Sequence, residues 1–172
     1  MASCVFFGNS DFSGNISDYL ADTVKDLILT QKVDTFYVGH HGNFDRSVIR
    51  FLKRLKREYP TVHYFVMLSR LPCPQWLADE PTVFPEGIEN VPPKYAILYR
   101  NDLMLEKADY VILYSRYSTG GTARMERKAR LKGKKVIHLA DPVELMKYED
   151  LIKKLDEYDE YNSKKSKEKA QR

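Results

Sequence analysis

Short apolar runs alternate along this chain with segments in which apolar residues recur at helical spacing. The runs cover residues 4–7, 35–38, 62–68, 110–114 and 136–139, and several have the near-continuous apolar character of strands covered on both faces. Helices are expected between and after them, over residues 16–28, 48–55, 94–107, 122–132 and 142–158. The alternation predicts an α/β fold, a Rossmann-like doubly wound sandwich with a mainly parallel sheet and the strand order 3-2-1-4-5.

Residues 70–93 interrupt this alternation. The segment carries six of the eight prolines of the chain and no strong periodicity, and long loops in compact domains are usually functional or disordered. Its apolar residues, among them Trp76 and Phe84, favour a segment packed over another part of the protein. A lid or a dimer arm fits these features better than a linker, and a homodimer or higher oligomer is therefore one expected partner.

The net charge of +4 belongs to the end of the chain. Residues 163–172 hold five basic residues and one acid, so residues 1–162 are neutral as a whole. A charge run of this kind is typical of a solvated, disordered tail. We therefore expect one domain over residues 1–162, followed by a basic tail, and the neutral domain makes a nucleic-acid partner unlikely on electrostatic grounds.

The two cysteines, Cys4 and Cys73, lack the CxxC spacing of metal and redox sites. Unpaired cysteines are typical of a reducing cytosol. The first residues show no signal peptide, and no run of about 18 apolar residues occurs that would span a membrane. The sequence thus predicts a cytoplasmic protein with no membrane partner, no bound metal and no cofactor.

A glycine-rich junction follows the strand expected at residues 110–114. Gly120 and Gly121 allow close approach of the backbone to a ligand, the following helix begins with unpaired N–H groups, and hydroxyl groups come from Ser118, Thr119 and Thr122. This pattern predicts a phosphate site, although it is neither a P-loop nor a GxGxxG fingerprint. In the alternative interpretation, Thr122 is a plain helix N-cap and the glycines form a plain turn.

Two more polar, glycine-bearing loops follow the first and second strands. Ligands bind beyond the carboxyl ends of the strands in doubly wound sheets, so we expect these loops to meet the glycine-rich junction. The candidate ligand-binding residues are Gly8, Asn9, Ser10 and Asp11 in one loop, and Gly39, His40, His41, Gly42, Asn43 and Asp45 in the other. Adjacent histidines at a strand end point to opposite faces, which argues against joint metal binding. Asn43 and Asp45 would serve equally well as helix caps.

Three charged or polar residues of the expected helices are further candidates. Arg100 suits phosphate recognition and Asn101 suits a base edge or ribose, unless both simply form a wet helix face. Glu126 is the only acid in the fourth helix and could act as a catalytic carboxylate on a bound sugar. It also precedes Arg130 by four residues, which favours a structural ion pair.

These motifs, taken in order, resemble those of the SLOG superfamily, which includes the LOG phosphoribohydrolases and the DprA-type DNA-processing proteins. The closest similarity is to bacterial and phage members of that group. It spans roughly residues 3–140 and rests on Phe6 to Gly8, Phe36 to Asp45, Pro85 to Glu89, Val91 with Pro92, Arg100 and Asn101 with Met104, and Gly120 to Thr122.

The resemblance implies a pocket for a nucleotide or nucleotide derivative, including a cyclic or ADP-ribose-like signal read in some defence systems. The partner would be a phosphorylated nucleoside derivative, held by a sensor or sequestering protein. A nucleotide N-glycosidase is the enzyme alternative, with Glu126 or Asp11 assisting water and Arg100 or Arg124 holding phosphate. The LOG signature PGGxGTxxE is incomplete here, because Glu126 lies four residues after Thr122 instead of three. DNA binding in the DprA manner is the third alternative.

Overall fold

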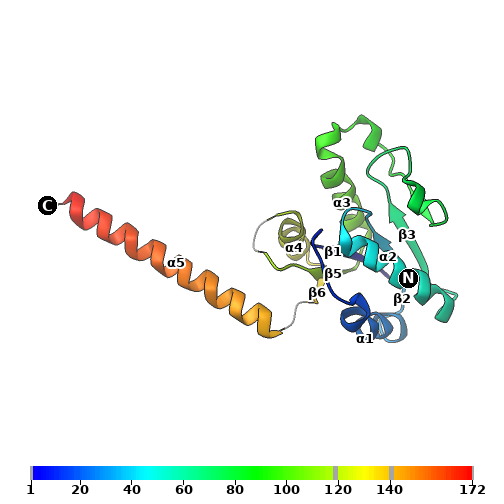
Figure 1. Ribbon diagram of the computed structural model, residues 1–172, viewed down its shortest axis with the longest axis horizontal. Helices are drawn as coiled ribbons and strands as arrows, with labels where there is room; N and C mark the ends of the chain where they lie inside the picture. The colour runs from blue at the N-terminus through cyan, green and yellow to red at the C-terminus, as the bar shows by residue number, and fades with distance from the viewer. Residues whose placement is uncertain (1, 118–119, 140–141, 172) are drawn as a thin grey trace. The chain divides into compact units, whose positions relative to one another are not determined.

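The computed structural model describes residues 2–117, 120–139 and 142–171, and in these ranges it contains one six-stranded, all-parallel sheet (Figure 1). The spatial order is β4-β3-β2-β1-β5-β6, which confirms the Rossmann-like α/β fold. The five expected strands occur in the expected order, and β4 is added at one edge. The strands are β1 (Ala2–Gly8), β2 (Val33–Val38), β3 (His63–Met67), β4 (Thr82–Val83), β5 (Tyr110–Tyr114) and β6 (Lys135–His138).

The added strand β4 lies within the proline-rich segment 70–93. It pairs with β3 in parallel, and at the ends of this pairing the N–H of Val66 donates to the oxygen of Pro81 and the N–H of Leu68 donates to that of Val83, both at 2.8 Å. A proline is tolerated at this edge of the sheet because only its carbonyl oxygen takes part in the pairing, so the missing N–H is not needed. The segment also forms three short 3-10 helices, at Gln75–Leu77, Ile88–Asn90 and Pro93–Tyr95. It is therefore an ordered extension of the sheet.

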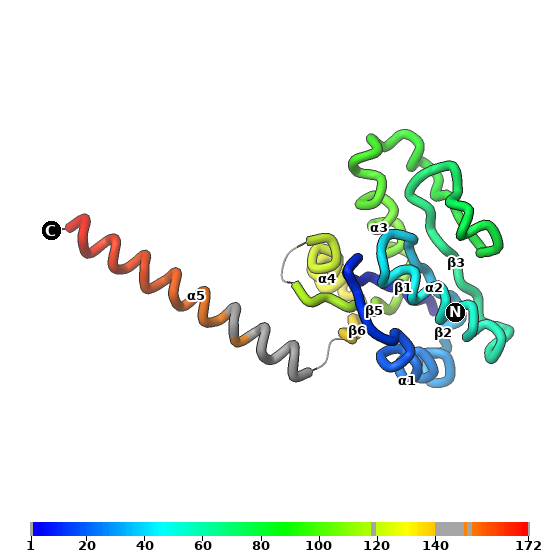
Figure 2. Tube along the Cα trace, viewed as in Figure 1, coloured from blue at the N-terminus to red at the C-terminus, as the bar shows by residue number. Residues whose placement is uncertain are grey.

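Two helices cover each face of the sheet (Figures 1 and 2). Cys4 and Phe6 of β1 point into the core formed with α1 and α2, and the alternate residues Val5 and Phe7 point into the core formed with α3 and α4. This alternation follows from the two-residue period of a strand and explains the continuous apolar run. The helices are α1 (Ile16–Leu29), α2 (Asn43–Glu58), α3 (Ala96–Lys107) and α4 (Gly121–Leu131).

Residues 140–172 form a second unit, which consists of the helix α5 (Pro142–Ala170). We expected this helix to end near Tyr158 and residues 163–172 to be a disordered tail, but residues 163–170 continue the helix. Lys, Glu and Ala are good helix formers, so a charged end can still be helical. The compact first unit ends at Leu139. None of the helices in the described ranges combines the length and the apolar character needed to cross a bilayer.

Candidate functional site

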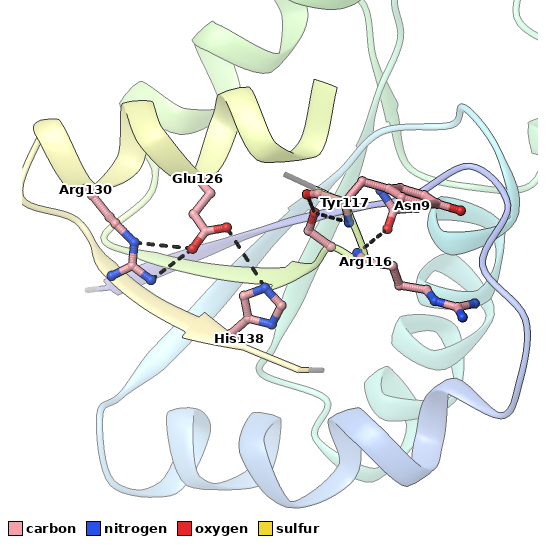
Figure 3. A network of polar contacts seen from close by, with 7 residues as sticks. Asn9, Arg116, Tyr117, Glu126, Arg130 and His138 are labelled. Atoms are coloured by element: carbon pink, nitrogen blue, oxygen red, sulfur yellow. Dashed lines mark hydrogen bonds and ion pairs between the residues drawn. The ribbon is translucent and has the colours of Figure 1, made fainter. Parts of the chain in front are cut away.

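Three loops meet at the carboxyl edge of the sheet. The N–H of Asn43, after β2, donates to the carbonyl oxygen of Ser10, after β1, at 2.8 Å. The N–H of Arg116, after β5, donates to the side-chain oxygen of Asn9 at 2.8 Å (Figure 3). These bonds confirm the convergence expected from the parallel topology.

A cavity of about 390 Å³ lies at this junction and is called the first cavity below. The loops after β1, β2 and β5, together with α3 and the start of α4, line it. Most of the predicted ligand-binding residues are among the lining residues: Gly8, Asn9, Ser10, Asp11, Gly39, His41, Asp45, Arg100, Asn101, Gly120, Gly121 and Thr122. The sequence thus brought the right residues to one place, and their role in binding stays a prediction.

The remaining predicted residues are not among these lining residues. Ser118 and Thr119 fall outside the described residues. Gly42 and Asn43 are not among the residues that line the first cavity. Gly42 has a φ of 93° and packs so closely on Ser10 that a Cβ atom there would lie 2.5 Å from the Ser10 Cα. Its role is therefore to let the loops after β1 and β2 touch.

Arg100 of α3 is buried in the wall of the first cavity, with 2% of its surface exposed. Its Nε and Nη2 atoms donate to the Asn101 side-chain oxygen at 3.2 and 2.9 Å. Within the described part of the chain, Nη1 has no hydrogen-bond partner. A buried guanidinium N–H without an acceptor is costly, so this atom marks a place where an acceptor from a ligand would be stabilised.

Asp45 and Arg100 face one another across Gly39. A Cβ atom on Gly39 would lie 2.7 Å from Arg100 Nη2 and 2.8 Å from Asp45 Oδ2, so only glycine leaves room for both side chains. Asp45 Oδ2 also accepts the N–H of His41 at 2.8 Å. The carboxylate thus ties α2 to the loop before it and has a place on the cavity wall. It is not a helix cap as expected, nor is Asn43, because the N-cap of α2 is Gly42 and, among the described residues, no side chain caps this helix.

Burial raises the pKa of Asp45 from its ordinary 3.8 to about 6, although Arg100 and the His41 N–H oppose the rise. Burial of Arg100 lowers the pKa of its guanidinium, and Asp45 opposes that change. The desolvation of both groups shows that the polar wall of the cavity is shielded from bulk water. Perturbed groups of this kind cluster at functional sites.

We expect Asp45 to make the stability of the chain depend on pH. Between pH 3.8 and about 6 the folded chain holds a proton that the unfolded chain has lost. This contribution to the free energy of unfolding is complete below pH 3.8 and is lost as the pH rises through about 6. Relative to Asp45→Asn, the wild type should therefore lose up to about 3 kcal/mol between pH 3.5 and 7. Urea denaturation of both proteins across this range measures the difference, and a constant difference would contradict the assignment.

The N-terminus of α4 supplies the second anion-attracting feature of the cavity. Its N-cap is Gly120, with a φ of 95°, and among the described residues no side chain caps the helix. The N–H of Arg124 is the first to bond within the helix, to Gly120 at 3.0 Å. The N–H groups of Gly121, Thr122 and Ala123 belong to the first turn, which lacks intrahelical acceptors and carries the positive end of the helix dipole. Neither glycine would place a Cβ atom within 4 Å of another group.

His40 has a structural role in this part of the molecule. Its Nε2 accepts the backbone N–H of Ser69 at 3.2 Å, which ties the end of β2 to the end of β3. Burial lowers the pKa of His40 to about 4, with Arg100 and Arg70 adding to the effect. His40 is therefore neutral near pH 7 and lies outside the lining of the first cavity.

Glu126 does not line the first cavity. Its carboxylate accepts Arg130 Nη2 at 3.0 Å and lies 4.0 Å from His138 Nε2. Figure 3 shows Glu126 pointing toward these two residues. The predicted structural ion pair is thus confirmed, and the catalytic role suggested for Glu126 has no geometric support. Arg124 likewise pairs with another residue, Asp102, at 3.7 Å.

Sequence reasoning did not identify several residues that line the first cavity. Tyr117 is the polar one, and its hydroxyl donates to Asp11 at 2.6 Å, which raises the pKa of the tyrosine. Its place in the same loop as Gly120 was the available signal. The others are apolar, and their pattern indicated only core positions: Phe6, Phe7, Ile97, Met104 and Met125.

The described residues contain no group of three or more His, Cys, Asp or Glu side chains that could hold a metal ion. A scan against protein-family models gives no match for this chain. A search of curated proteins likewise finds no relative. The functional argument therefore rests on the geometry of the site.

Proposed function

We propose that this chain binds a nucleotide or nucleotide-derived signal in the first cavity and acts in the cytoplasm as a sensor or sequestering protein. The observation that carries the proposal is the buried Arg100, whose Nη1 atom finds no acceptor in the described chain. A phosphate oxygen supplies that acceptor. It would remove the desolvation cost of the unpaired N–H and gain a charge-assisted hydrogen bond.

The start of α4 supports the same assignment. Gly120, Gly121 and Arg100 line one cavity, so an anion there would meet the free N–H groups of the helix and the guanidinium together. Helix N-termini with this exposure bind phosphate through both hydrogen bonds and the helix dipole. The open space beside the two glycines leaves room for the phosphate oxygens.

Asp45 and Asn101 provide the groups that a ribose requires. The Asp45 carboxylate is a hydrogen-bond acceptor on the cavity wall, and acidic side chains commonly bind ribose hydroxyl groups in Rossmann-like sites. The Asn101 amide oxygen is occupied by Arg100, which leaves its NH₂ group as a donor. Phosphate, sugar and their recognition groups therefore fit one cavity, as the SLOG resemblance implies.

The N-glycosidase alternative is weaker because Glu126 lies outside the first cavity and pairs with Arg130. We expect Glu126→Gln to leave nucleotide affinity unchanged within about twofold. An exposed helical pair of this type is worth about 0.3–0.5 kcal/mol, so the melting temperature should also change little. Titration of both proteins with the same nucleotide checks this. If the wild type releases free base and Glu126→Gln does not, the chain is instead a nucleotide N-glycosidase.

DNA binding has one local observation in its favour. A cavity of about 410 Å³ on α2 is lined by Arg50, Lys53, Arg54 and Arg57, which gives a basic surface on an otherwise neutral domain. Lys53 is paired with Glu80 at 3.1 Å. Retention on DNA that falls steeply with salt would support this alternative.

A panel of 5′-nucleotides, ADP-ribose, nucleosides and inorganic phosphate, added to the full chain, tests the proposal. The phosphorylated compounds should raise the melting temperature, by an amount equivalent to about 2.7 kcal/mol at a hundredfold excess over Kd, and the nucleosides should not. Chromatography of the mixtures should show no free base. A panel in which no phosphorylated compound shifts the melting temperature contradicts the proposal.

A further inference from the structure

A second cavity of about 440 Å³ adjoins the first. His41 and Ile97 line both cavities, so these two side chains mark the place where the cavities meet. His41 is exposed and Ile97 is half-buried at the start of α3. The junction thus includes a residue that lies three positions before Arg100 in α3.

The wall of the second cavity differs chemically from that of the first. The proline-rich segment provides most of it, and its contribution is mainly apolar: Leu71, Phe84, Ile88, Val91 and Pro93. The polar lining groups are His40, His41, Ser69, Arg70 and Glu89, and Ser69 and His40 already contact one another. Apolar walls with a few polar groups are typical of pockets that hold a ring system.

This wall is built into the fold. The pairing of β4 with β3 holds Phe84 directly after a bonded strand. Ile88 has 3% of its surface exposed and Leu77 has none, so buried side chains anchor the segment on both sides of β4. The Tyr99 hydroxyl also donates to the Glu86 carbonyl oxygen at 3.4 Å, linking the segment to α3. The fold itself therefore holds the wall of the second cavity in place, which favours binding of a rigid planar group.

We propose that the second cavity binds the base of the nucleotide whose phosphate lies in the first cavity. The inference rests on the proposed function and adds an orientation: phosphate at Arg100 and α4, ribose beside Asp45, and base past His41 and Ile97. The proline-rich segment is then the base-recognition element of the site. A purine or pyrimidine has apolar faces that pack on Phe84 and Val91, and its polar edge meets Ser69, Arg70 and Glu89.

Calorimetric titration with AMP, GMP, CMP, UMP and ribose 5-phosphate tests this orientation. For the wild type, the best nucleotide should bind at least about tenfold more tightly than ribose 5-phosphate. Val91→Trp fills part of the second cavity and should abolish this difference while leaving ribose 5-phosphate affinity within twofold, because Val91 does not line the first cavity. Leu71→Trp, at an exposed position that also lines only the second cavity, should do the same, which keeps the test decisive if either variant fails to fold. Tyr95→Trp is the control, because Tyr95 is 49% exposed and lines neither cavity.

The inference is overturned if ribose 5-phosphate binds as tightly as every nucleotide. It is also overturned if the folded tryptophan variants keep the advantage of the nucleotide. In either case, the first cavity still acts as proposed if the wild type binds ribose 5-phosphate and Gly121→Val abolishes that binding. Absence of binding by all five compounds would remove both the proposed function and the orientation.

Discussion

Gly121→Val is expected to lower nucleotide affinity by at least about a hundredfold while leaving the melting temperature nearly unchanged. A Cβ atom at this position meets no described residue within 4 Å, and the backbone of Gly121 lies outside the left-handed region that favours glycine, so valine fits the described part of the chain. The new side chain occupies the space in which a phosphate would approach the first turn of α4. Loss of two charge-assisted N–H bonds, each worth about 1.5–3 kcal/mol, gives an effect of this size.

Calorimetric titration of the variant measures the loss of nucleotide affinity, and thermal denaturation followed by circular dichroism measures the melting temperature. Gly121→Ala should give an intermediate loss, because a methyl group fills less of the space. Leu131→Val, at the 89% exposed far end of α4, controls for substitution within the same helix. If Gly121→Val binds the best nucleotide of the panel as well as the wild type does, the phosphate assignment at α4 is wrong.

Arg100→Met is expected to remove nucleotide binding to a similar extent, by about a hundredfold. Methionine keeps most of the apolar stem and removes the guanidinium, whose buried Nη1 has no hydrogen-bond partner among the described residues. The loss of stability should depend on pH, because Arg100 lowers the pKa of Asp45. Without it the carboxylate is buried alone, so the melting temperature should fall more at pH 7.5 than at pH 5.5, where Asp45 takes up a proton.

Arg100→Lys distinguishes the contribution of the positive charge from that of the planar guanidinium group. Lysine retains the positive charge but not the planar fork that bonds to Asn101 and leaves Nη1 free, so an intermediate affinity is expected. Binding should be compared with the wild type at pH 5.5, where the fold of each variant is verified by circular dichroism. Affinity within threefold of the wild type in folded Arg100→Met would mean that Arg100 is a structural residue.

The sheet and the meeting of the loops were predictable because both follow from local patterns. A buried parallel strand is a continuous apolar run, as in Cys4 to Phe7, and parallel strands bring their carboxyl ends to one edge. The strand β4 was not predictable, because two residues between prolines give no period. It forms through tertiary hydrogen bonds, among them those that the N–H groups of Val66 and Leu68 donate to Pro81 and Val83.

The chemistry of the candidate site was predictable only in part. The side-chain chemistry of Arg100 and Asn101 made both of them candidates, but the sequence did not reveal that Arg100 is buried and lies close to Asp45 beside Gly39. Such a contact joins residues far apart in sequence. Glu126 illustrates the reverse, since its i+4 spacing to Arg130 correctly indicated the ion pair. The second cavity could not be foreseen, because it depends on how residues 70–93 pack.

Backbone amide NMR of the uniformly ¹⁵N-labelled chain tests the central claim most directly. On titration with the best nucleotide of the panel, the resonances of Gly121, Thr122 and Ala123 should shift in proportion to occupancy. The corresponding nucleoside should leave these three resonances in place, because it lacks the phosphate. Shifts confined to the α2 surface of Arg50, Lys53, Arg54 and Arg57, with the first turn of α4 unchanged, would contradict the account.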